Sequence, residues 1–167
     1  ILDKDFFLSG RGQFDPQAHE HQAILILTHL VTEREQMKAI RKLGVKHLIH
    51  TLEVIDDQLR HRIMPRITRN PTLQSKGNVS FAQVLNSIPY GVAVFGKDRF
   101  TVGIILGPDT LDTTIDGLSQ MHNAGLHSLS YPVYQAYNIT ALSYYAMSFR
   151  EVMVAKRLAT QLFVRCY

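Results

Sequence analysis

The sequence is poor in two residue types that mark common classes of protein. Among its 167 residues there is a single cysteine, Cys166, and no tryptophan. One cysteine cannot form an internal disulfide and cannot build a cysteine-based zinc site. Disulfide-rich secreted scaffolds and zinc fingers are therefore excluded, and the cysteine count favours a reducing compartment.

The sequence also lacks a long uninterrupted apolar run. The most apolar stretch is 133–149, and a bilayer-spanning helix needs about 20 consecutive apolar residues. The stretch is interrupted by Gln135, Asn138, Thr140, Ser143 and Ser148. No basic-then-apolar signal peptide opens the sequence. We therefore expect no membrane span, and a location in the cytoplasm or within an assembled particle.

Patterns that identify catalytic, metal or phosphate sites are missing as well. There is no G-x-S-x-G turn and no H-E-x-x-H pair, and the glycines of 91–107 are not gathered into a phosphate-binding loop. His47 and His50 stand three residues apart, but no carboxylate follows at a spacing that would complete a zinc site. We therefore expect no metal and no cofactor. A non-enzymatic protein is favoured, with a small enzyme of unknown class as an alternative.

Positive charge is concentrated in one part of the sequence. From Arg34 to Lys76 there are ten Lys or Arg against four Asp or Glu, giving +6 in a chain whose net charge is +4. The densest run could neutralise nucleic-acid phosphates, or could be a solvated helix face with a basic loop. It has no aromatic residue for stacking bases, so contact would be sequence-tolerant. The candidate phosphate-binding residues are Arg60, Arg62, Arg66, Arg69 and Lys76.

A long segment of the sequence carries no charge at all. From Gly117 to Phe149, 33 residues include no Asp, Glu, Lys or Arg but hold five of the seven tyrosines. Interface centres are depleted in charge and enriched in tyrosine, although a buried core helix would also avoid charge. We expect self-association through this segment. The candidate contact residues are Tyr131, Tyr134, Tyr137, Tyr144, Tyr145 and Phe149.

Apolar spacing and capping residues predict the elements. Residues 1–14 read as an extended arm, and 15–167 as a single globular domain. Apolar residues at intervals of three and four predict two long helices, over 15–43 and 45–64. A short helix over 80–87 is expected to end at Pro89, followed by a β-hairpin within 90–107.

Two further helices complete the predicted chain. One begins at Pro108 and ends near Asn123, with Asp109, Asp112 and Asp116 placed favourably for its dipole. The last runs from about Val133 to Phe163. The expected fold is α+β and predominantly α-helical, with long N-terminal helices, one central β-hairpin and a long C-terminal helix.

These observations predict a non-enzymatic structural subunit. It would self-associate through the uncharged, tyrosine-rich segment, as a homo-oligomer or as part of a coat-like or shell-like assembly. The alternative is a nucleic-acid-associated protein that binds phosphates through the basic loop, and coat-like subunits can combine both properties.

Overall fold

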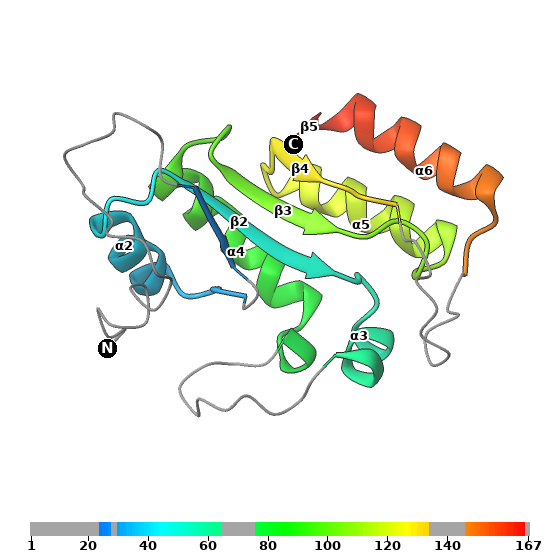
Figure 1. Cartoon of the computed structure of the whole chain (residues 1–167), viewed down its shortest axis with the longest axis horizontal. Coiled ribbons are helices and arrows are strands. Elements are labelled where there is room, and N and C mark those ends of the chain that lie inside the picture. Colours follow the sequence, from blue (N-terminus) through cyan, green and yellow to red (C-terminus); the bar gives the residue numbers. More distant parts are fainter. Residues whose placement is uncertain (1–23, 28–29, 65–75, 134–145, 166–167) are drawn as a thin grey trace, which may run out of the picture.

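The protein has a mixed α/β fold built on a parallel sheet (Figure 1). The computed structural model describes residues 24–27, 30–64, 76–133 and 146–165. Its five strands lie side by side in the order in which they occur along the chain, and every neighbouring pair is parallel. The strands are β1 (Ile24–Leu27), β2 (His47–Glu53), β3 (Phe100–Ile104), β4 (Ser128–Ser130) and β5 (Val164–Arg165).

The helices connect successive strands, and the four longest of them form a single row. They are α2 (Arg34–Lys42), α3 (Asp57–Ile63), the short 3-10 helix η1 (Lys76–Asn78), α4 (Phe81–Phe95), α5 (Leu111–Asn123) and α6 (Phe149–Leu162). Crossovers between parallel strands are right-handed, so a strand order that never reverses places its helices on one face. In agreement, α2 contacts α4, α4 contacts α5, and α5 contacts α6.

The strand register separates the core side chains onto two faces. Gly91 in α4 lies against the Phe100 ring, so the Phe100 side chain faces the helices. Leu48 is the register partner of Phe100 on β2 and faces the same side. The opposite face carries polar groups. His47 Nε2 lies 2.8 Å from Thr101 Oγ1, which lies 2.9 Å from Ser128 Oγ. These contacts join three adjacent strands by buried hydrogen bonds.

The two long N-terminal helices predicted from apolar spacing are wrong. Within the first, the structure has strand β1 and the shorter helix α2; the predicted arm and residues 15–23 lie outside the described residues. Within the second, β2 is followed by α3. A central parallel strand is apolar on both faces, and β2 is buried along most of its length. Because both faces of β2 carry apolar residues, its sequence also has apolar residues at intervals of three and four, which is the spacing that predicts a helix.

The predicted β-hairpin is also wrong. Helix α4 continues through Pro89 to Phe95 and ends at Gly96, whose φ of 97° suits glycine. The turn at Gly96 joins this helix to a strand instead of joining two strands: its carbonyl accepts the N–H groups of Arg99 and Phe100. Strand β3 then pairs in parallel with both neighbours, where a hairpin would be antiparallel.

The predictions for the last two helices are closer to the structure. The helix expected to end near Asn123 is α5, capped by Thr110, whose side chain accepts the Thr113 N–H. The C-terminal helix is present as α6, which Ser148 and Glu151 start with a capping box. The predicted start of this helix near Val133 is wrong, because Val133 forms a bridge with Leu106 and α6 begins at Phe149; residues 134–145 lie outside the described residues.

A histidine lies in the centre of the core. His50 is fully buried, its ring meets the Phe100 ring edge-on at 5.1 Å, and neither ring nitrogen has a hydrogen-bond partner among the residues that the structure describes. Burial lowers the pKa of His50 to about 3, because the apolar surroundings disfavour the imidazolium. The fold therefore requires this histidine to be neutral.

The close approach of α4 to β3 can be tested at Gly91. A methyl group there would overlap the Phe100 ring, and that ring is fully buried. We expect Gly91→Ala to lower the free energy of unfolding by about 1–3 kcal/mol, measured by urea denaturation. Ala93→Ser, at an exposed position of the same helix, is the control. Equal stability of the two variants would contradict this packing.

The buried histidine predicts a specific pH dependence. The unfolded chain takes up a proton on His50 below the ordinary pKa of 6.5, while the folded chain resists it down to about 3. Stability should therefore fall as the pH falls through this window, by up to about 1.4 kcal/mol per pH unit from this group. His50→Leu should flatten the profile measured by urea denaturation. An unchanged slope in the variant would show that His50 does not supply this term.

Candidate functional site

The loops that leave the carboxyl ends of β2, β3 and β4 lie together at one edge of the sheet. Leu106, after β3, forms a parallel bridge with Val133, after β4, and donates its N–H to the Pro132 carbonyl at 2.9 Å. The Gly107 carbonyl accepts the N–H groups of Ala146 and Met147 at 3.0 and 3.3 Å. The segments on both sides of 134–145 are thereby attached to the loop after β3.

Asp109 fastens the loop after β3 to the loop after β2. Its carboxylate is 2% exposed and accepts the backbone N–H groups of Ile55 and Asp56, both at 2.9 Å. Burial raises the pKa of Asp109, and the two N–H bonds and Arg60 partly oppose that rise. The predicted role of Asp109 as a favourable charge at a helix start is wrong, because its carboxylate binds a neighbouring loop.

Arg60 holds the same loop from the other side. Its side chain is 1% exposed and donates to the carbonyls of Val54 at 2.6 Å and Ile55 at 3.2 Å. It also donates to the Val79 carbonyl at 2.5 Å and forms an ion pair with Asp57. Arg60 therefore connects the end of β2, helix α3 and the segment that begins α4.

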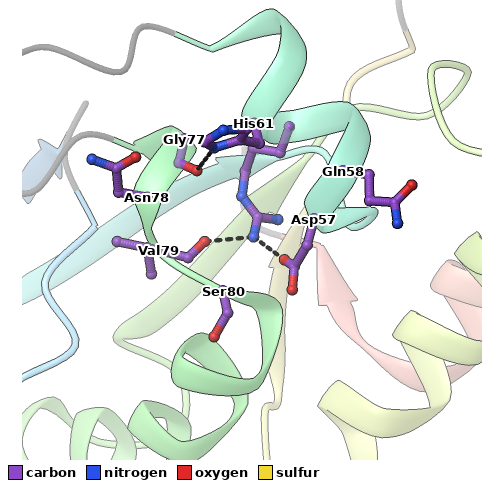
Figure 2. Close-up of a pocket in the computed structure, with 8 residues that line it drawn as sticks. Asp57, Gln58, His61, Gly77, Asn78, Val79 and Ser80 are labelled. Carbon is purple, nitrogen blue, oxygen red and sulfur yellow. Dashed lines mark hydrogen bonds and ion pairs between the residues drawn. The ribbon is translucent and has the colours of Figure 1, made fainter.

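A pocket opens beside this arginine (Figure 2). Its volume is about 440 Å³, and residues of α3 and of the η1–α4 segment line it. Figure 2 shows Asp57 and His61 on one wall and Gly77, Asn78, Val79 and Ser80 facing them. The His61 ring nitrogen Nδ1 lies 3.1 Å from the Gly77 carbonyl oxygen, which joins the two walls.

The groups that line this pocket are engaged in holding helices. Asp57 accepts the Phe81 N–H at 2.7 Å as well as the Arg60 guanidinium. The Ser80 hydroxyl caps α4: it accepts the Gln83 N–H and lies 3.2 Å from Gln83 Oε1. Among the described residues the Ser80 hydroxyl donates to Gln83 Oε1 and not to a base, so the contacts shown are those of a helix cap and not of an activated nucleophile.

Strain is present at the carboxyl end of β2. Glu53 has a φ of 72°, and the register with β3 shifts between Thr51 and Glu53. Its carbonyl accepts the Ile105 N–H at 2.8 Å, which holds the two strands together beyond the shift. A non-glycine residue in this region costs of order 1 kcal/mol or more.

The structure separates the predicted phosphate-binding residues. Arg60 is buried and bound to carbonyl groups and to Asp57, so its assignment to a surface patch is wrong. Arg62 is exposed on α3. Arg66 and Arg69 lie outside the described residues, as does the side chain of Lys76. Of the five candidate phosphate-binding residues, Arg62 is therefore the one whose side chain the described part of the chain shows at the surface.

The predicted self-association residues also fall into different groups. Tyr131 is 5% exposed, and its hydroxyl lies 3.0 Å from Thr160 Oγ1 in α6. It therefore packs within the subunit, and its prediction as a self-association contact is wrong. Phe149 is 81% exposed. The other predicted tyrosines lie outside the described residues; they are Tyr134, Tyr137, Tyr144 and Tyr145.

Sequence reasoning missed the exposed apolar residues that follow Phe149. Met153 and Val154 on the same helix are 46% and 47% exposed, and Val164, beyond the other end of α6, is 53% exposed. The apolar residues of the predicted C-terminal helix cover more than one face, which signals burial on more than one side. The prediction located that signal in the uncharged segment, which ends at Phe149 and leaves out most of α6.

Searches for metal and membrane sites give no candidates in the part of the chain that the structure describes. No group of three or more His, Cys, Asp or Glu side chains there could hold a metal ion. None of the described helices is both long enough and apolar enough to cross a membrane. The sequence matches no protein-family model and no curated protein.

The Asp109 contacts predict a large effect of a small substitution. Asp109→Asn places an amide N–H₂ opposite one of the two backbone N–H groups, so that a buried donor loses its acceptor. We expect a loss of about 1–3 kcal/mol in the free energy of unfolding, measured by urea denaturation. Glu33→Gln, at an exposed acid whose side chain makes no capping hydrogen bond, should change stability by less than about 0.5 kcal/mol. A similar small change at Asp109 would mean that the carboxylate does not hold the loop.

Proposed function

We propose that the protein is a non-enzymatic subunit that self-associates, with α6 at the centre of the contact. The observation that carries the proposal is where the exposed apolar side chains lie. Seven large apolar side chains of the described residues are exposed, and four of them are on α6 and β5. Those four are Phe149, Met153, Val154 and Val164.

The arrangement along α6 supports a docking role. Val152, Ala155 and Ala159 bury one side of the helix, and Phe149 and Met153, four residues apart, share another side that is open. A helix with a second apolar side is typical of one that packs on two neighbours. Here the described neighbour is α5, and a second copy of the chain would cover the open side.

The uncharged segment that leads into α6 agrees with this proposal. The exposed residues Phe149, Met153 and Val154 lie at and just beyond its end. The centre of a protein–protein interface is depleted in charged residues, and a charge-free segment that leads into exposed apolar residues has that composition. A closed homo-oligomer or a larger shell-like assembly would both use such a surface.

Self-association can be tested by measuring mass in solution. We expect the purified protein to exceed its monomer mass of 19.0 kDa in size-exclusion chromatography with light scattering. Phe149→Ser combined with Met153→Ser should weaken association by about tenfold or more, since buried apolar anchors dominate such contacts. Leu43→Ser combined with Tyr90→Ser, exposed apolar residues away from α6, is the matched control. A wild-type monomer at high concentration would refute the proposal.

A second candidate is the binding of a small molecule at the carboxyl edge of the sheet. Bound molecules in open α/β sheets lie outside the carboxyl ends of the strands, and the backbone strain at Glu53 lies at that edge. This candidate ranks second because the described strand order has no reversal, the point where such crevices form.

The second candidate can be tested through the strained residue. Glu53→Gly should stabilise the fold, because glycine adopts a positive φ without strain. If the strain serves binding, a thermal-shift screen with amino acids, sugars and nucleotides should find a stabilising compound for the wild type. The same compound should protect Glu53→Gly less. A screen in which no compound protects either protein would remove this candidate.

A further inference from the structure

The outer sides of α5 and α6 carry opposite charges. Asp112 and Asp116 are exposed on α5, four residues apart, on the side opposite the buried Leu118. Arg150 and Arg157 are exposed on α6, seven residues apart, on the side opposite the buried Ala155. At about 3.6 residues per turn, each spacing places the pair in one row along its helix.

The two rows belong to one surface. Helices α5 and α6 contact each other and run in the same direction, with their amino ends at the same end of the sheet (Figure 1). Asp112 is the second residue of α5 and Arg150 the second residue of α6. In the described part of the chain no ion pair joins the acids of one row to the bases of the other. Asp116 accepts a hydrogen bond from the neutral Gln120 side chain at 2.6 Å, which leaves its charge unbalanced.

We propose that the subunit forms a twofold dimer in which the acidic row of α5 faces the basic row of α6 in the second copy. The inference rests on the self-association proposed above and specifies its geometry. A twofold axis parallel to the two helices places α5 of one copy opposite α6 of the other, twice, as an isologous interface requires. Asp112 and Asp116 then face the second copy's arginines, and the same contact repeats on the other side of the axis.

Charge also disfavours the other simple arrangement. An axis perpendicular to the helices places α6 against α6 and α5 against α5, so that arginines face arginines and aspartates face aspartates. Like charges across an interface oppose association. In the parallel-axis dimer Val154, which lies between Arg150 and Arg157 in the basic row, is covered by the second copy. The apolar and ionic contacts therefore support the same arrangement.

Charge reversal on each row tests this geometry. An acid-reversed chain carries Asp112→Arg and Asp116→Arg, and a base-reversed chain carries Arg150→Asp and Arg157→Asp. Each chain alone places like charges across both contacts, and we expect it to dissociate at least about tenfold more readily than the wild type. Mixed in equal amounts, the two chains restore opposite charges at both contacts. We expect them to form a one-to-one heterodimer, measured by light scattering and by capture of one tagged chain with the other.

The outcomes separate this inference from the proposal on which it rests. Recovery of the heterodimer on mixing, lost again at high salt, supports the geometry. If the reversed chains remain dimers, or stay monomeric after mixing, the geometry is overturned. In that case, loss of association in Phe149→Ser with Met153→Ser would leave self-association standing. A wild-type monomer overturns both.

A milder variant is available should a charge-reversed chain fail to fold. Asp112→Asn combined with Asp116→Asn should weaken the dimer without dissociating it completely. A dimer of unchanged affinity would count against the geometry.

Discussion

The backbone of residues 54–56 is held from both sides by two buried ionic side chains. Asp109 accepts the N–H groups of Ile55 and Asp56, while Arg60 donates to the carbonyls of Val54 and Ile55. A buried charge left without partners costs several kcal/mol, so each side chain depends on this loop as much as the loop depends on them. The contacts fix the ends of β2 and β3 relative to each other. They also hold in place the segments that lead into α3, α4 and α5, while local capping side chains set the first residue of each helix.

The surface that we assign to association depends on this framework through α5. Gly117 of α5 packs against Ile55, in the loop that Asp109 holds; a Cβ at Gly117 would lie 2.8 Å from the Ile55 side chain. The close contact fixes the rotation of α5 about its own axis, which decides that Asp112 and Asp116 point outward. A surface charge pattern is therefore a consequence of packing at the carboxyl edge of the sheet.

The sequence predicts the later helices better than the early ones, for a physical reason. The starts of α5 and α6 are set by local capping side chains, which are visible in a few consecutive residues. Strand β2 depends on partners far along the chain. Its Leu48 and Leu52 are four residues apart, a spacing that places both on one face of a strand and also on one face of a helix. Apolar spacing alone could not decide between the two.

The roles of Arg60 and Asp109 were beyond a reading of the sequence for the same reason. Arg60 lies within a basic run and Asp109 within a run of helix-start acids, and each run suggests a surface charge. Both side chains are buried against backbone groups that are distant in sequence. Asp109 accepts the N–H of Ile55, 54 residues away, and Arg60 donates to the carbonyl of Val79, 19 residues away. Phe149 was predicted as a contact residue because it is the last residue of a charge-free segment, which is a local property, and the structure shows that it is exposed. Met153 and Val154 were missed because basic residues surround them.

The order of the strands has a consequence for how the chain is made. Each strand pairs with the strand that precedes it along the chain, so the sheet can grow one βα unit at a time during synthesis. Helix α6 and strand β5 follow the other four strands along the chain and join the sheet after them. The surface that we propose for association is therefore the last of the described parts to form, after the strands that support it are in place.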